Sequence, residues 1–112
     1  MITNTIITNS TTTIFTSSND NAINLMVFCN TDDTTTLLLT VYVIPQADSA
    51  SPANKHIIIR KTKLNPLETL TFSTEKLILA NGDTIRAKAT LTDGSSAPPT
   101  DSMASTVSSI AL

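Results

Sequence analysis

The residues that could do chemistry in this chain are few, and each also has a plain structural interpretation. His56 is the only histidine, so a serine–histidine–aspartate or cysteine–histidine arrangement would have to be built on it. Cys29, the only cysteine, lies in an apolar stretch, and the chain contains no Gly-x-Ser-x-Gly turn. A small hydrolase built on His56 is therefore the weakest of the functional alternatives.

Acidic residues suggest two further kinds of site. Asp32 and Asp33, followed by three threonines, could form a cation loop, since hard cations take carboxylate, hydroxyl and carbonyl ligands. Glu68, Glu75 and Asp83 could supply the paired carboxylates of glycoside hydrolysis if two of them shared a concave face. All five adjoin predicted turns, which favours hydration and hydrogen bonds to turn amides. We therefore predict no catalytic, cofactor-binding or metal-binding residues.

Lys55, Arg60, Lys61 and Lys63 form the one cationic stripe in the sequence. Such a stripe can meet an acidic partner, or it can protect an edge strand against further pairing, which is the commoner use. The formal net charge is −2, and the chain has only three Phe and one Tyr. Nucleic-acid binding needs a denser positive face and more stacking platforms, so no nucleic-acid partner is expected.

Length and composition limit the architecture that can position these residues. The chain has 112 residues, of which 21 are Thr, 12 are Ser, 2 are Gly and none is Trp. This length suits one domain and excludes a second catalytic domain. No apolar run approaches the roughly 18 residues of a membrane span, and the N-terminus lacks the features of a secretory signal. We expect a soluble protein, made in a cytoplasm, with no membrane partner.

Strands are predicted throughout, because apolar and polar residues alternate and no helical periodicity persists. Asn81-Gly82-Asp83 indicates a hairpin turn, since Asn and Gly tolerate positive φ. Further turns or loops are predicted at 46–54, at Asn65-Pro66 and at 93–99. In the strand after the hairpin, Arg86 and Lys88 should point outward. The predicted strands are 23–29, 37–44, 56–64, 67–72, 77–79, 85–91 and 103–112.

The pattern predicts an all-β chain folded as a single-domain antiparallel β-sandwich of about seven to eight strands, Ig-like or jelly-roll-like. A five-stranded barrel is the alternative, although two glycines give little of the kinking that small barrels use at their corners. The sandwich domain should span 21–112. Residues 1–20, rich in Thr, Asn and Ser, should be either an irregular first strand or an arm that docks on a neighbouring subunit.

Three segments carry a resemblance to a known family. Asn24-Leu25 followed by Asn30-Thr31, then Thr40-Val41, resemble two successive strands of small virion proteins of tailed bacteriophages, of the type found in cyanophages and marine phages. The segment from Leu77 to Ala87, with its Gly82-Asp83 pair, is similar to a later hairpin of that family. Ser105 to Ser108 is similar to its closing strand. The resemblance covers about 21–112.

The resemblance implies a non-enzymatic structural component of the virion, such as a capsid decoration, neck or tail accessory protein. It carries over no catalytic residue and no cofactor. It implies that the protein contacts other copies of itself, forming a homo-oligomer, and the major capsid, neck or tail proteins of the particle. The alternative is a host-surface or glycan-binding module of the same fold, in which the loops at 46–54 and 93–100 meet a surface polymer.

Overall fold

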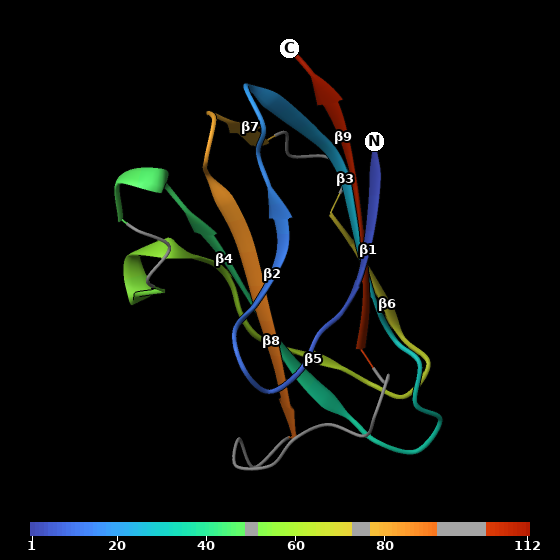
Figure 1. Cartoon of the computed structure of the whole chain (residues 1–112). Helices are drawn as coiled ribbons and strands as arrows, with labels where there is room; N and C mark the ends of the chain where they lie inside the picture. Colours follow the sequence, from blue (N-terminus) through green and yellow to red (C-terminus); the bar gives the residue numbers. More distant parts are fainter. Residues whose placement is uncertain (49–51, 73–76, 92–102) are drawn as a thin grey trace.

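Nine strands make up the sheets of the computed structural model, which describes residues 1–48, 52–72, 77–91 and 103–112 (Figure 1). Two short 3-10 turns, η1 (Gln46–Asp48) and η2 (Asn54–His56), lie between the fourth and fifth strands. Within these ranges no helix is long and apolar enough to cross a membrane. The strands are β1 (Ile2–Ile6), β2 (Thr12–Thr16), β3 (Asn21–Asn30), β4 (Leu37–Ile44), β5 (Ile57–Leu64), β6 (Thr69–Phe72), β7 (Leu77–Leu79), β8 (Thr84–Leu91) and β9 (Met103–Ala111).

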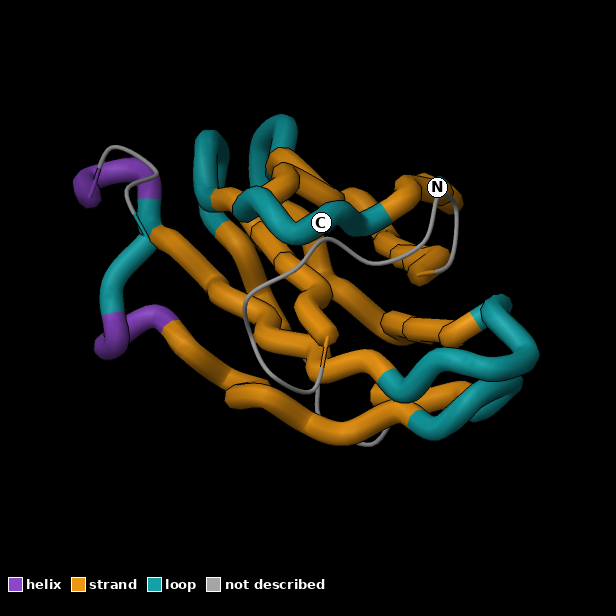
Figure 2. The backbone as a smooth tube through the Cα atoms, turned by 90° about the horizontal axis from the view of Figure 1, so that it is seen from below, coloured by secondary structure: helices purple, strands orange, loops and turns teal. Residues whose placement is uncertain are grey.

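The strands form two antiparallel sheets, which appear as two layers when the molecule is viewed from one end (Figure 2). Sheet A has the order β1-β9-β3-β6, and β7 also pairs with β3. Sheet B has the order β2-β8-β4-β5. The predicted antiparallel β-sandwich is therefore confirmed, and the five-stranded barrel is wrong.

The strand order distinguishes between the two predicted kinds of sandwich. β6 and β7 pair with different stretches of β3 on the same side of that strand, so they occupy one strand position in sheet A. Counting them as one strand, the sheets have the orders 1-8-3-6 and 2-7-4-5, which is the arrangement of an eight-stranded jelly roll. In an immunoglobulin fold the last two strands would pair with each other, whereas here β8 and β9 lie in different sheets.

The core lies between the two sheets and is built from the inward-facing residues of nearly every strand. On β8, Ile85, Ala87 and Ala89 are buried and Leu91 packs against the core, as the alternation in the sequence predicts. The small residues on β8 leave space for the larger side chains of the opposite sheet. The core comprises Ile7, Ile14, Phe15, Ile23, Met26, Phe28, Leu37, Leu39, Val41, Leu64, Leu79, Ile85, Ala87, Ala89, Met103 and Val107.

Residues 1–20 form two strands instead of an arm that docks elsewhere. β1 pairs with β9 and β2 pairs with β8, so this segment supplies one edge of each sheet. Ile7, Ile14 and Phe15 lie in the core, with exposed fractions of 1%, 1% and 3%. The many threonines hid this contribution, because only three large apolar side chains mark the inward positions.

An irregularity in β3 changes which of its residues face the core. The pairing of β3 with β9 shifts register between Ile23 and Leu25, which is a β-bulge. Ile23 faces inward before the bulge and Met26 faces inward after it, so Leu25 lies on the outer face of sheet A. The outer face of β3 is half-buried.

Buried Asn30 joins two connections at the far end of β3. Its side-chain amide donates hydrogen bonds to the carbonyl oxygens of Thr35, Leu64 and Asn65, at 2.8, 3.1 and 3.2 Å. Its side-chain oxygen accepts one from the Asp32 N–H at 3.1 Å. The side chain is fully buried, and its bonds reach the β3–β4 loop, the last residue of β5 and the first residue of the β5–β6 turn. Asn30 therefore holds the β3–β4 loop against the β5–β6 turn.

Candidate functional site

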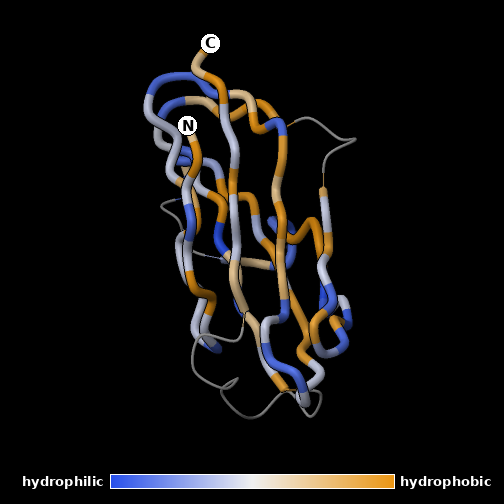
Figure 3. Tube along the Cα trace, turned by 90° about the vertical axis from the view of Figure 1, so that its right-hand side faces the viewer, coloured by the Kyte–Doolittle hydropathy of each residue, from blue (hydrophilic) through white to orange (hydrophobic). Residues whose placement is uncertain are grey.

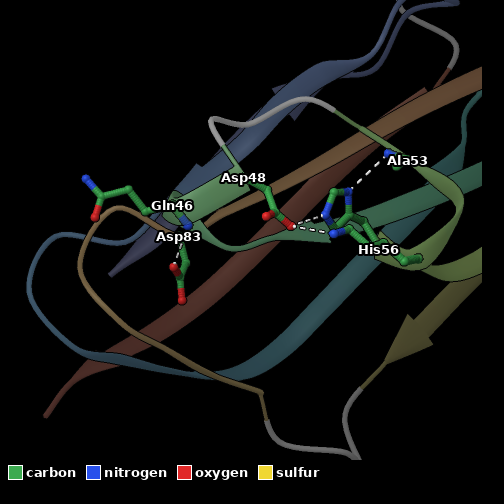
Figure 4. A network of polar contacts seen from close by, with 6 residues as sticks. Gln46, Asp48, Ala53, His56 and Asp83 are labelled. Carbon is green, nitrogen blue, oxygen red and sulfur yellow. Dashed lines mark hydrogen bonds and ion pairs between the residues drawn. The ribbon is translucent and has the colours of Figure 1, made fainter.

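The histidine on which a hydrolase would depend is held between two loop segments (Figure 4). His56 has an exposed fraction of 6%. Its Nδ1 accepts a hydrogen bond from the Ala53 N–H at 3.0 Å, so the ring proton must lie on Nε2. Nε2 then donates to the Asp48 carboxylate at 2.6 Å. Both ring nitrogens are thus engaged, and His56 closes the loop between β4 and β5.

His56 and Asp48 together form what we call the clamp, and the Asp48 carboxylate is its acidic member. The hydrogen bond from His56 is the main reason that the pKa of Asp48 is lowered, and the positive charge of Lys55, 3.5 Å away, lowers it further. Among the described residues, no hydroxyl or thiol is hydrogen-bonded to His56, so the pair does not activate a nucleophile there. The geometry of the clamp is structural.

The predicted cation loop at Asp32 and Asp33 uses its first carboxylate internally. One oxygen of Asp32 accepts hydrogen bonds from the Thr34 N–H at 3.2 Å and the Thr35 N–H at 2.6 Å. The side-chain hydrogen bond of Thr35 is the main reason that the pKa of Asp32 is lowered, and the two backbone bonds lower it further. Asp33 is exposed, and no group of three metal-ligating side chains occurs in the part of the chain that the structure describes.

The carboxylates considered for glycoside hydrolysis are not brought together. Glu68 accepts a hydrogen bond from the Asn65 N–H at 3.0 Å, beside the Asn30 end of β3. Asp83 accepts bonds from the N–H groups of Gln46 and Ala80, at 3.0 and 2.9 Å, at the opposite end of the sandwich. A ten-residue strand spans about 30 Å, so these two cannot act on one bond. Glu75 lies outside the described residues.

The turn around Asp83 explains why the sequence has a glycine there. Gly82 has a φ of +88°, and a Cβ at this position would lie 2.6 Å from the side chain of Gln46. Its N–H donates to the Ser17 carbonyl oxygen at 2.9 Å, and the Ser17 N–H donates to the Asp83 carbonyl oxygen at 2.9 Å. The predicted Asn-Gly-Asp turn is present, but the predicted hairpin is wrong, because β7 pairs with β3 in sheet A whereas β8 lies in sheet B. The turn joins the two sheets, and it connects to η1 through Gln46.

The cationic stripe is larger in space than in sequence. Lys55 pairs with Asp48 of the clamp, but Arg60, Lys61 and Lys63 of β5 remain on the outer side of sheet B. Tyr42 lies opposite Arg86, and Thr40 lies opposite Lys88, so the outward residues of β8 share this face. We call this set of five the cationic face: Arg60, Lys61, Lys63, Arg86 and Lys88.

A depression of about 210 Å³ lies in the cationic face between β8 and β5. Thr40 and Tyr42 of the intervening β4 have exposed fractions of only 4% and 7%, although they point away from the core. The aliphatic parts of neighbouring Arg and Lys side chains can cover such residues while their charged ends reach water. The depression is lined by Thr40, Tyr42, Asn54, Ile57, Arg60, Lys61 and Lys88.

The opposite surface, on the outer side of sheet A, carries no charged residue in the described chain. Strand register gives its members, because residues directly opposite each other point to the same side. Figure 3 looks onto this side of the molecule. We call it the neutral face: Ile2, Asn4, Ile6, Ala22, Leu25, Val27, Cys29, Thr69, Thr71, Ile78, Ala104, Thr106, Ser108 and Ile110.

Exposed apolar side chains concentrate on this neutral face and at the chain ends beside it. Ile2, Ile78 and Ile110 have exposed fractions of 68%, 72% and 53%. Of the eight large apolar residues exposed in the described chain, only Ile58 and Leu67 lie elsewhere. A gathering of exposed aliphatic residues without charge is typical of a protein contact surface.

The open edge of β1 borders this neutral face. Ser109 and Met1 exchange backbone hydrogen bonds. In an antiparallel pair, hydrogen-bonded and non-hydrogen-bonded residues alternate, so every second residue of β1 after Met1 makes no backbone bond to β9. The N–H and C=O groups of Ile2, Asn4 and Ile6 therefore point away from β9. β1 has no register shift and no charged residue, in contrast to β5, the bulged and cationic edge of sheet B.

Comparison with known proteins finds no match: no protein-family model, no curated protein and no solved structure matches this chain. The two faces must therefore be interpreted from their own geometry. Sequence reasoning noted the outward positions of Arg86 and Lys88 but did not join them to the β5 stripe, because the β4–β5 and β4–β8 pairings are long-range. It missed the neutral face, whose signal is the lack of charge at outward positions of 2–6, 22–29 and 104–110.

Proposed function

We propose that the protein is a non-enzymatic structural component of a tailed phage virion, which acts through contacts with neighbouring subunits. The observation that carries the proposal is the neutral face, which offers exposed isoleucines and, among the described residues, no charge on the outer side of sheet A. Charged side chains are depleted at the centres of protein interfaces, and aliphatic surface favours persistent contacts. Exposed aliphatic side chains do not stabilise a monomer in water, and they contribute free energy only when a partner covers them.

Two further observations support the proposal. The jelly roll is a recurrent fold of viral capsid domains, although it also serves lectins, so the fold alone does not choose between them. The described candidates for catalysis, His56, Glu68 and Asp83, and the cation-loop candidate Asp32 all make hydrogen bonds that hold loops and turns. The side chains that remain available for contacts with partners are those on the outer faces of the two sheets. A structural component of a particle acts through such contacts.

Within this function, the first partner that we assign to the neutral face is a second copy of the chain. β1 presents unpaired backbone groups along an edge that has neither bulge nor charge, and such an edge is a template for pairing with another strand. Two β1 strands paired across copies would join their neutral faces into one surface. That surface would then lie against a capsid, neck or tail protein of the particle.

The test is incorporation into particles of the phage that encodes the protein. Washed virions should contain the chain in a fixed ratio to the major capsid protein, measured by quantitative mass spectrometry. Ile6→Lys should lower incorporation at least tenfold, because it places a charge in the neutral face beside the β1 edge. Asn9→Lys, on an exposed loop, adds the same charge and should incorporate normally.

Light scattering after gel filtration separates self-association from folding. The wild-type chain should form a closed oligomer, and Ile6→Lys should be a folded monomer with an unchanged circular dichroism spectrum. Absence of the wild-type protein from washed virions would overturn the proposed function. Normal incorporation of Ile6→Lys would overturn the assignment of the contact to the neutral face.

A further inference from the structure

The cationic face poses a problem that the proposed function leaves open. It holds five of the seven Lys and Arg residues of the chain. Within the described residues, none of the five forms an ion pair, since the recorded pairs there involve only Lys55 and His56. The described acidic residues all lie in turns and loops, whereas these bases lie on strands. Like charges gathered on one surface repel each other unless a partner neutralises them.

Protection of a sheet edge explains only part of this arrangement. β5 is the edge of sheet B, and its bulges and basic residues fit the role of blocking further pairing. β8, however, lies between β2 and β4, so Arg86 and Lys88 protect no edge. Their presence on the same surface as the β5 cations points to a shared ligand.

The geometry of the depression limits the size of that ligand. Lys88 and the basic residues of β5 lie on either side of β4, so two strand spacings, or about 10 Å, separate their backbones. The depression of about 210 Å³ is smaller than the roughly 300–1,000 Å³ of sites for drug-sized molecules and cofactors. It can accept one side chain or a group of similar size.

Hydrogen-bonding capacity in and near the depression favours an anion. The side-chain amide of Asn54 and the charged ends of Lys88, Arg60 and Lys61 can all donate. Close by on β8, Nε of Arg86 is buried and has no hydrogen-bond partner among the described residues. A buried donor without an acceptor is costly, and a carboxylate oxygen would satisfy it.

The aromatic residues distinguish between classes of anionic partner. Binding of single-stranded nucleic acid relies on bases that stack on exposed aromatic rings. The chain has four aromatic residues, and none offers an open ring: Tyr42, Phe15 and Phe28 are buried, and Phe72 packs against the core. Carboxylates need no ring, and Ile57 and Leu38 on the same face can contact apolar residues between the acids.

We infer that the cationic face is a docking site for an acidic segment of a partner protein. One Asp or Glu side chain of the segment enters the depression between Lys88 and Arg60, and neighbouring carboxylates meet Arg86 and Lys63. The inference rests on sheet B alone and does not depend on the function proposed for the neutral face.

Fluorescence anisotropy with a labelled decapeptide of alternating Glu and Ser tests this site in the full-length protein. Binding should be saturable and should weaken as salt is raised from about 50 to 300 mM, because screening shortens the reach of charges. Lys88→Gln should weaken binding about fivefold or more. Lys55→Gln removes the same charge outside the cationic face and should change affinity less than twofold.

A second measurement keeps the result independent of folding. In amide NMR spectra the peptide should shift the signals of Thr40, Tyr42 and Lys88, and leave that of Thr106 on the neutral face unmoved. If Lys88→Gln proves less stable, Lys63→Gln, whose side chain is exposed, should give the same loss of binding.

Three outcomes would overturn the inference. One is equal weakening by Lys88→Gln and Lys55→Gln, which would mean that only net charge matters. Another is tighter binding of a sulfated polysaccharide than of the peptide, which would assign the face to a glycan. The third is tighter binding of a ten-nucleotide single-stranded DNA. A particle-incorporation defect of Ile6→Lys would be unaffected by any of these results.

Discussion

Asn30 makes four hydrogen bonds through one buried polar side chain. Its amide and carbonyl oxygen together tie the β3–β4 loop to the β5–β6 turn, and the group is shielded from water. A buried polar group with several partners specifies a single arrangement of the loops around it.

Replacing Asn30 by Ala should therefore lower the free energy of unfolding by about 2–4 kcal/mol, because three carbonyl groups and one N–H lose their partner. Urea unfolding measures this change. Asn9→Ala, on an exposed loop, should alter the free energy by less than about 0.5 kcal/mol. Equal values for the two variants would mean that Asn30 is dispensable.

Two aspartates make the stability of the fold depend on acid. The pKa values of Asp32 and Asp48 are lowered in the folded chain below the ordinary value of 3.8, by hydrogen bonds from Thr35 and His56 respectively. At pH values between the lowered pKa and the ordinary one, the unfolded chain binds more protons than the folded chain. Stability from these groups is thus fully present above about pH 4 and is lost as the pH falls through the folded pKa values.

Thermal unfolding at a series of pH values between about 5 and 2 should show this loss in the wild type. Asp48→Asn should have a shallower acid dependence and a lower stability at pH 5, since its hydrogen bond with His56 loses its charge. Asp20→Asn is the control, because the exposed Asp20 side chain makes no recorded hydrogen bond within the described residues. An unchanged acid slope in Asp48→Asn would show that the clamp contributes nothing.

At the scale of elements, β1 and β2 show where local pattern was insufficient. A run such as 3–16 is so rich in threonine that its alternation is weak, and it could be read either as a strand or as a docking arm. Ile14 and Phe15 are adjacent and both buried, because a bulge between Thr13 and Phe15 turns successive residues inward. Alternation cannot predict such an irregularity.

Deletion of residues 1–16 should abolish cooperative folding. The deletion removes Ile7, Ile14 and Phe15 from the core, worth about 5–9 kcal/mol of apolar burial, and exposes the edges of β8 and β9. This loss is comparable to the whole stability of a small domain. The dispersion of the amide NMR signals reports whether the truncated chain folds. The control is a chain in which Gly-Ser replaces Thr8 to Ser10, because it keeps both strands. A well-dispersed spectrum of the truncated chain would show that the domain folds without these residues, as expected if they were a docking arm.

The strands with strong alternation, in contrast, were predictable nearly residue by residue. β4 and β8 follow their predicted spans closely, and the position of the turn between β7 and β8 was evident from Asn-Gly-Asp, although this turn joins the two sheets instead of two paired strands. These features depend only on neighbours in sequence, since the period of two and the turn residues are local properties. Which of Arg60 to Lys63 would face outward was less clear, because bulges in β5 reset the alternation there.

At the scale of the whole molecule, the choice between an Ig-like and a jelly-roll sandwich could not be made from sequence. It depends on whether β9 joins the sheet of β8 or that of β3, and both strands have compatible alternation. The same pairing creates the two surfaces, because it collects the uncharged outward residues of β1, β3 and β9 on one side. The basic residues of β5 and β8 meet on the other side only through β4.

The pairing of β1 with β9 also has a consequence for how the chain is made. The two strands join positions more than 100 residues apart, such as Ile2 and Ser108. The native pairing of β1 cannot form before β9 has been synthesised, so Ile6 and Ile7 lack their native neighbours until then. The loop that this pairing closes contains all the other strands of the sandwich, so its closure costs more chain entropy than the pairing of strands that are close in sequence.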